Sequence, residues 1–150
     1  MSAPAAHGAP AGGEAVVIVD WTPTWVTSLY DRDVREAWQR LVSLLEPFLD
    51  ASHGIPVIPV NAMELGRVSF NGIRTAYLTG IYGRLCVDTV AEHLRALGIE
   101  VVFVTDGIVW AEPGPPRDWQ EEEHPHDRER YASAVTTGEL AARWLGREAA

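Results

Sequence analysis

The sequence predicts an α/β domain, a three-layer α/β/α sandwich built on a mostly parallel sheet. Short apolar, β-branched runs alternate along the chain with segments whose apolar residues follow three-and-four spacing. The first such run, residues 15–19, is apolar throughout, which is typical of a strand that is covered on both faces. Strands that alternate with helices favour right-handed crossovers, which place helices on both faces of one sheet.

Length and composition predict one domain. The 150 residues are enough to bury a core, and the hydrophobic fraction of 47% is ordinary for a globular protein. Residues 1–14 are rich in alanine, proline and glycine and have neither a basic start nor an apolar centre, so we expect a disordered lead rather than a signal peptide. Residues 15–150 then form the single domain.

Charge and cysteine usage limit the partners and the location. The net charge of −9 argues against nucleic acid and against an anionic membrane surface, and no apolar run approaches the length of a membrane-spanning helix. Cys86 is the one cysteine, so no internal disulfide can form, and a reducing cytoplasm is expected. All 12 basic residues are arginines.

The first half of the domain alternates as follows. We expect the strand 15–19 to close on Asp20, a helix over 33–50 and a strand over 55–60 whose prolines indicate a sheet edge or a strand end. A short helix over 62–70 with Asn61 as its cap is the next prediction, and a strand over 75–78 follows the turn at Asn71 and Gly72.

The second half continues the alternation. We predict a helix from Cys86 to a stop at Gly98, then a strand over 100–105 that ends on Asp106. Residues 111–127 are rich in proline and glutamate, so we expect them to be the least ordered internal segment. A helix near 127–132, a strand at 134–135 and a terminal helix over 140–145 complete the chain, the last opened by a capping box of Thr136 and Glu139.

Polar and reactive residues gather at one predicted edge of the sheet. Asp20, Asp106 and the pair Thr79–Gly80 fall at the carboxyl ends of strands, where open α/β sheets bind ligands, and Cys86 falls in the first turn of the next helix. The partial positive charge of a helix N-terminus favours thiolate over thiol, which would suit a nucleophile. The alternative is a buried structural cysteine that packs the helix on the sheet.

Four segments resemble the isochorismatase-like superfamily of cysteine hydrolases. Residues 16–20 (VVIVD) resemble its first strand and catalytic aspartate, and residues 78–87 (LTGIYGRLCV) resemble its nucleophile turn. Residues 98–106 (GIEVVFVTD) resemble its next strand, and residues 134–140 (AVTTGEL) its last strand-to-helix step. The resemblance covers about residues 15–146 and implies a Rossmann-like, isochorismatase-like fold.

The resemblance also implies a mechanism. Asp20 would deprotonate Cys86, which would attack an amide-type carbonyl and form a thioester that water then hydrolyses. The backbone amides of Tyr82 and Cys86 would hold the oxyanion, with a cis peptide bond between Ile81 and Tyr82. No cofactor is implied, the substrate would be a small molecule, and the family's usual state is a homo-oligomer.

The sequence departs from the family pattern in the segment before the third strand. The family's third catalytic residue is a lysine from this segment, but the chain has no lysine, and residues 61–74 are shorter than the usual excursion. Arg67 is a candidate replacement, against the alternative of a solvated arginine. The aspartate–x–histidine zinc pattern is absent after the second strand, so we expect no metal. Arg84 stands where the family commonly has an acidic or amide residue.

Several other residues have a functional interpretation that is weaker than that of Asp20 and Cys86. Trp21 and Trp25 are candidate pocket walls or, equally, core or subunit-contact residues. Asp106 is expected to be a turn or cap residue. His124 and His126 lie in an acidic, proline-broken stretch that suits a solvated loop better than a metal cluster. The segment 111–127, bracketed by Trp110 and Trp119, is a candidate lid.

Three functions stay open at this point. The first is hydrolysis of a small-molecule amide or related C–N bond through Cys86 and Asp20. The second is a catalytically degenerate relative that binds a ligand or a partner, which the missing lysine and the shortened segment favour. The third is hydrolysis of a vinyl ether with Asp20 as the acid, against which Cys86 speaks weakly.

Overall fold

The computed structural model describes residues 13–20, 32–46, 55–110 and 127–149. These residues form a five-stranded sheet in the order β2-β1-β3-β4-β5, with every neighbouring pair parallel. The strands are β1 (Glu14–Val19), β2 (Val57–Val60), β3 (Thr75–Gly83), β4 (Glu100–Trp110) and β5 (Ala134–Val135). The predicted α/β class and parallel sheet are confirmed.

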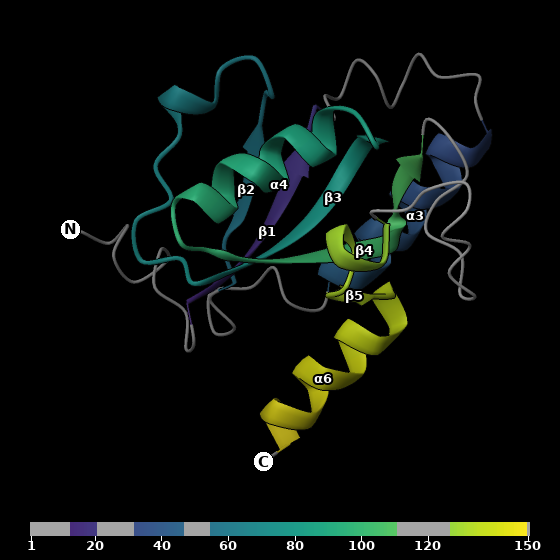
Figure 1. Ribbon diagram of the computed structural model, residues 1–150. Coiled ribbons are helices and arrows are strands. Elements are labelled where there is room, and N and C mark those ends of the chain that lie inside the picture. The colour runs from purple at the N-terminus through teal and green to yellow at the C-terminus, as the bar shows by residue number, and fades with distance from the viewer. Residues whose placement is uncertain (1–12, 21–31, 47–54, 111–126, 150) are drawn as a thin grey trace.

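Helices cover both faces of the sheet (Figure 1). Helix α4 (Cys86–Ala96) packs on one face, and α3 (Arg32–Leu45) and α6 (Thr137–Ala149) pack on the other. Alternate residues of β1 point to opposite layers: Val17 and Val19 join the core under α4, whereas Val16 and Ile18 join the core with α3 and α6. A strand buried on both faces has no polar side to show, which explains its unbroken apolar run.

Two connections are shorter than a full helix. The α-helix that we expected over residues 62–70 is wrong, because this stretch holds only the 3₁₀ turn η2 (Leu65–Arg67). The side chain of Asn61 accepts a hydrogen bond from the Met63 amide at 2.8 Å and so closes a local turn instead of capping a helix. The predicted helix near 127–132 is the single turn α5 (Asp127–Arg130).

Both central strands run further than their apolar patterns indicated. β3 continues beyond Leu78 to Gly83, and β4 continues beyond Thr105 to Trp110, with register shifts between them at Leu78/Gly80 and Ile81/Gly83. These register shifts keep polar residues and glycines within the paired strands. The strands therefore lack the regular apolar pattern from which their ends could be predicted. The expected extension of the first helix past residue 46 lies outside the described residues.

The start of α6 is fixed by the predicted capping box. The Glu139 carboxylate accepts from the Thr136 amide at 3.1 Å, and the Thr136 hydroxyl accepts from the Glu139 amide at 3.1 Å. This reciprocal pair satisfies donors that the helix itself leaves free. The result confirms the prediction for this helix terminus.

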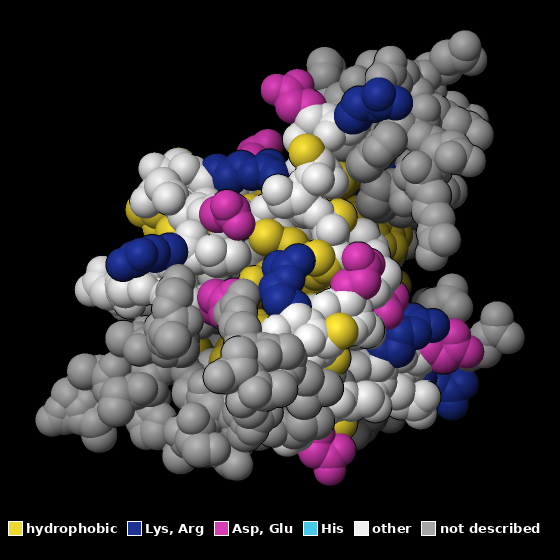
Figure 2. All heavy atoms as spheres, turned by 90° about the horizontal axis from the view of Figure 1, so that it is seen from below, with side chains coloured by type: hydrophobic (Ala, Val, Ile, Leu, Met, Phe, Trp, Pro, Cys, Tyr) yellow, Lys and Arg dark blue, Asp and Glu magenta, His cyan; other side chains and the backbone are white. Residues whose placement is uncertain are grey.

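Surface charges are mixed over the face shown in Figure 2, where arginine and acidic side chains alternate among the described residues. A net charge of −9 accompanies this mixture. A basic stripe, the usual electrostatic footprint for nucleic acid, is not seen on this face of the described chain. Within the described residues, no helix is both long and apolar enough to cross a membrane.

Candidate active site

Asp20 occupies the carboxyl end of β1 in an unusual backbone conformation. Its φ of 54° lies in the left-handed region, which aspartate tolerates better than most residues. Its amide donates to the Val60 carbonyl at 2.9 Å, and its carboxylate accepts from the Ala62 amide at 2.9 Å. The two contacts tie the end of β1 to the end of β2 and fix where the carboxylate lies.

Cys86 is the first residue of α4 and follows a tight turn out of β3. The peptide bond between Ile81 and Tyr82 is cis, as the family resemblance implied. A Cβ on Gly80, whose φ is 116°, would collide with the main chain of Val19. Glycine is therefore required there, because it alone brings β3 this close to β1 at the edge where the reactive groups lie.

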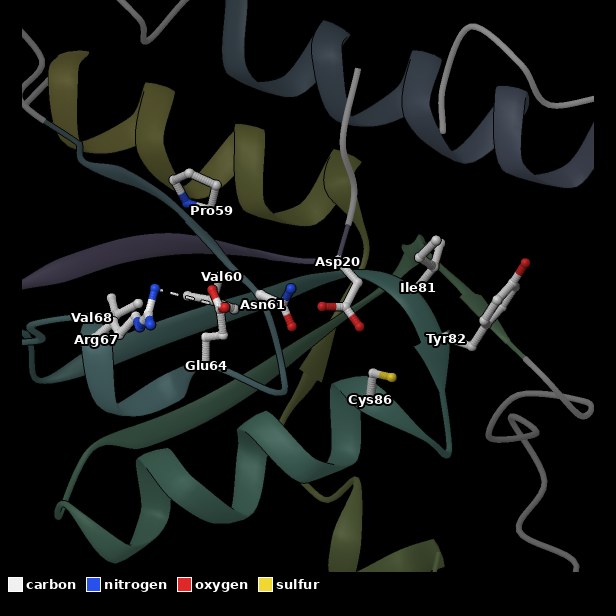
Figure 3. A pocket seen from close by; sticks show the side chains of 10 residues that line it. All are labelled: Asp20, Pro59, Val60, Asn61, Glu64, Arg67, Val68, Ile81, Tyr82 and Cys86. Carbon is white, nitrogen blue, oxygen red and sulfur yellow. Dashed lines mark ion pairs between the residues drawn. The ribbon is translucent and has the colours of Figure 1, made fainter. Parts of the chain in front are cut away.

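The carboxylate of Asp20 and the thiol of Cys86 lie at the same end of the cavity (Figure 3), and Asp20 acts on the thiol through a hydrogen bond. This hydrogen bond, followed by burial and by the negative charge of Asp20, raises the pKa of the Cys86 thiol. The backbone amides of Tyr82 and Cys86 act in the opposite direction and lower the pKa, but they do not outweigh Asp20. The resting pair is thus a neutral thiol that donates to a carboxylate.

That protonation state corrects the sequence-based expectation for the thiol. The N-terminus of α4 was expected to favour the thiolate, but the carboxylate beside the sulfur opposes a second negative charge more strongly. A base in hydrogen-bond contact can take the proton while the sulfur attacks. The arrangement is suited to general-base activation rather than to a preformed thiolate.

The pair lies in an open cavity of about 640 Å³. Apolar side chains from β2, β3 and the connection after β2 make up much of its wall, and Asn61, Glu64 and Arg67 add polar groups. The lining residues are Asp20, Pro59, Val60, Asn61, Glu64, Arg67, Val68, Ile81, Tyr82 and Cys86. The volume is sufficient for a small organic molecule in contact with the sulfur.

Arg67 lines the cavity on the opposite side from the thiol and carboxylate in Figure 3. Its guanidinium pairs with Glu64 at 3.8 Å, and its side chain is 81% exposed. An exposed pair of this kind contributes little to stability and leaves the guanidinium hydrated. The donor that contacts Asp20 in this segment is instead the uncharged amide of Ala62.

Solved structures resemble this chain in fold. An isochorismatase-like hydrolase from Alkaliphilus metalliredigens has a TM-score of 0.55 at 13% identity, with 87% of this chain and 98% of that one covered. N-carbamoylsarcosine amidase from Thermoplasma acidophilum has a TM-score of 0.53 at 14% identity, with 83% and 96% covered. The octameric YcaC hydrolase of unknown specificity from Escherichia coli has a TM-score of 0.54 at 16% identity, with 86% and 78% covered.

The chain has the isochorismatase-like fold. No protein-family model and no curated protein gives a match to the sequence. Identities of 13–16% establish the fold alone, so the chemistry of this chain rests on its own side chains.

Arg84, a candidate pocket residue, lies elsewhere in the isochorismatase-like fold. Its guanidinium lies 5.5 Å from the ring centre of Tyr131, and it is not among the described residues that line the cavity. The positive φ of 70° at Arg84 turns the chain at this point. Trp21 and Trp25, the other candidate pocket residues, lie outside the described residues, as do Trp119 and most of the segment 111–127.

Asp106 has the structural role that the sequence indicated. Its two carboxylate oxygens accept from the amide of Thr137 at 2.7 Å and from its hydroxyl at 2.8 Å, at the start of α6. These bonds hold the helix to β4. No group of three or more metal-binding side chains occurs within the described residues, and His124 and His126 lie outside them.

Sequence reasoning missed the groups that complete the cavity. The Ala62 amide contacts Asp20, and Val60, Val68 and Ile81 form much of the apolar wall. A main-chain donor leaves no mark in a sequence, since any residue except proline supplies it. The asparagine turn after β2 was the available signal, because Asn61 favours the local turn that aims the next amide at Asp20.

Proposed function

We propose that this chain is a hydrolase of small-molecule amides or related C–N bonds, with Cys86 as the nucleophile and Asp20 as its base. The observation that carries the proposal is that Asp20 and Cys86 line the same open cavity, and the effect of Asp20 on the pKa of the thiol supports it. The similarity in fold to isochorismatase-like hydrolases, including an amidase, supports the same class of reaction. The substrate would contact the sulfur from the cavity, and no cofactor is needed for this chemistry.

The proposed reaction begins with attack of the sulfur on the carbonyl carbon. As the S–C bond forms, the thiol proton passes to Asp20, and the carbonyl oxygen becomes an oxyanion. The backbone amides of Tyr82 and Cys86, which lower the pKa of the thiol, would donate to that oxygen. The C–N bond then breaks, and the departing amine takes the proton from Asp20, which leaves a thioester.

Water completes the cycle. Asp20 accepts a proton from the water as its oxygen attacks the thioester carbon, and the C–S bond breaks to release the carboxylic acid. The thiolate recovers the proton from Asp20, which restores the neutral thiol and the carboxylate. The reaction needs no external oxidant or reductant. Asp20 thus acts four times, as the base for each of the two attacks and as the acid for the departing amine and for the departing thiolate.

The missing lysine does not remove either partner of this step. In the described residues the neutral Ala62 amide contacts Asp20, and Arg67 pairs with Glu64 instead. Among the described residues no cation forms an ion pair with Asp20, and its hydrogen bond and, to a smaller degree, its charge raise the pKa of Cys86. We infer that proton transfer in this chain depends on the carboxylate alone.

The test is release of amine or ammonia from a panel of small primary amides and carbamoyl compounds. Intact mass spectrometry would detect the thioester on wild type, with Cys86→Ala and Asp20→Asn as the comparison variants. Hydrolysis by wild type that both variants lose supports the proposal. A vinyl ether hydrolysed by wild type and Cys86→Ala but not by Asp20→Asn would instead establish acid chemistry, and no turnover at all would favour a binding or structural role.

We further propose that the protein forms a homo-oligomer, which the octameric state of the YcaC relative supports. Light scattering coupled to size-exclusion chromatography would test this directly, and a monomer at micromolar concentration would contradict it. The cytoplasmic location stays a prediction from the single cysteine.

A further inference from the structure

The turn between β3 and α4 places both of the amides that lower the pKa of the Cys86 thiol. Its ends are Tyr82 and Cys86, and the Leu85 amide closes it by donating to the Tyr82 carbonyl at 3.1 Å. Arg84 lies at its centre with a φ of 70°. The separation of the two amides therefore depends on how firmly the main chain at Arg84 is held.

Asp88, in the first turn of α4, holds that point. Its Oδ1 accepts from the Arg84 amide at 3.3 Å, and its Oδ2 accepts from the Tyr131 hydroxyl at 2.7 Å. Arg130 contributes a longer ion pair to Oδ2 at 3.5 Å, in which the Asp88 side chain is only 12% exposed. One carboxylate thus links the turn to the segment between α5 and β5.

Tyr131 is well placed to fix this carboxylate. Its ring is fully buried and makes edge contacts with Phe103 at 4.8 Å and Trp110 at 5.3 Å between ring centres. Burial and the contact with Asp88 raise the pKa of Tyr131, so its hydroxyl keeps the proton that it donates. The Arg84 guanidinium lies over the same ring at 5.5 Å, so Tyr131 touches the turn by two routes.

The other side of the turn is also closed. A Cβ on Gly83 would collide with the Trp110 ring, whose indole nitrogen donates to the Thr105 carbonyl at 3.0 Å. Trp110 is thereby anchored to β4, and it contacts both the turn and Tyr131. Trp110 thus restrains the turn at Gly83, and Asp88 restrains it at the Arg84 amide.

We propose that Tyr131, acting through Asp88, is a positioning residue that holds the two amides of the turn around the Cys86 sulfur. This inference rests on the proposed function, because it assigns those amides to the oxyanion. Tyr131 and Asp88 do not line the cavity and touch no substrate. Their effect would be exerted on the geometry of the main chain alone.

The fold offers a matched control for this hydrogen bond. The Tyr77 hydroxyl donates to the Glu14 carboxylate at 2.7 Å, also in a buried site, and Tyr77 lies near the start of β3, away from the turn. Tyr77→Phe and Tyr131→Phe each delete one buried tyrosine–carboxylate bond and retain the ring. A merely stabilising bond would give the same result at both positions.

The experiment compares wild type, Tyr131→Phe and Tyr77→Phe by the pH dependence of Cys86 alkylation with iodoacetamide. For Tyr131→Phe we expect the midpoint to rise, because the two amides favour the thiolate and would no longer be held in place. We also expect an alkylation rate at neutral pH that is lower by about tenfold, the usual scale for one hydrogen bond to a charged group. Tyr77→Phe should change neither quantity.

A second measurement tests the route through Asp88. In an Asp88→Ala background, Tyr131→Phe should have almost no further effect on alkylation, since both substitutions break the same link. Hydrogen exchange at the Arg84 amide should be faster in Tyr131→Phe and unchanged in Tyr77→Phe. An undiminished effect of Tyr131→Phe in the Asp88→Ala background would overturn the route, and equal effects of the two phenylalanine variants would overturn the positioning role.

These measurements need no substrate, so their outcome does not depend on whether the proposed function is correct. If wild type hydrolyses no amide, the proposed function is lost, whereas alkylation and exchange still report whether Tyr131 holds the turn. If wild type is active and Tyr131→Phe lowers kcat but leaves KM unchanged, both inferences stand. If Tyr131→Phe leaves kcat, alkylation and exchange as in wild type, only the positioning role is overturned.

Discussion

The Cys86 thiol and the Asp20 carboxylate meet at the carboxyl ends of two adjacent parallel strands, where Asp20 is the largest cause of the raised pKa of the thiol. The two residues are far apart in sequence, and the sheet order brings them together because β1 and β3 are neighbours. Parallel pairing puts the ends of both strands at the same edge. The contact is thus a direct consequence of topology.

Gly80→Ala should destabilise the fold strongly. Its φ of 116° disfavours any side chain, and the new Cβ would meet the Val19 main chain. We expect a loss of about 3 kcal/mol or more in the free energy of unfolding. Gly66→Ala is the matched control, since a Cβ at Gly66 meets no atom within 4 Å. Urea denaturation of both variants checks the prediction, and equal stabilities would refute the close approach of β1 and β3.

Asp106→Ala should affect stability and leave the thiol unchanged. The substitution removes both hydrogen bonds to Thr137 at the start of α6, for an expected cost of about 2 kcal/mol. Because Asp106 does not line the cavity, the alkylation profile of Cys86 should match that of wild type. Thermal unfolding and alkylation are measured on the same sample. A shifted thiol midpoint with normal stability would mean that Asp106 belongs to the site.

Arg67→Gln should leave the thiol midpoint of Cys86 unchanged. Its guanidinium pairs with Glu64 and is 81% exposed, so water screens its charge from the sulfur. We expect any effect on turnover to be in KM, because Arg67 lines the cavity that would receive the substrate. A large fall in kcat together with a raised midpoint would show that Arg67 does replace the lysine of the family.

Much of the fold could be predicted because each local pattern agreed with its position in the sheet. The apolar run of β1, the glycine stop near Gly98 and the capping box at Thr136 each gave the correct element. The predicted helix over residues 62–70 failed because its apolar residues pack against the core without helical hydrogen bonds. Three residues of 3₁₀ turn and an asparagine turn satisfy this backbone instead.

The site was harder to predict than the fold. Asp20 and Cys86 were both predicted as site residues from strand and helix ends, and their proximity in the cavity follows from the parallel order. The protonation state of the thiol was not predictable, because it depends on whether Asp20 raises the pKa of the thiol more than the two backbone amides lower it. The link from Tyr131 through Asp88 to Arg84 was also invisible, since it joins segments that only the folded chain brings together.

The pH dependence of Cys86 alkylation in wild type and Asp20→Asn tests the central claim most directly. Asp20 is the largest cause that raises the pKa of the thiol, so removal of its charge should lower the midpoint, while the two amides still favour the thiolate. Asp106→Asn, which changes a carboxylate at the same end of the sheet, should leave the midpoint unchanged. We predict a wild-type midpoint above the ordinary range for a thiol and a clearly lower one in Asp20→Asn. A midpoint that is the same in both proteins would contradict the pairing of Cys86 with Asp20.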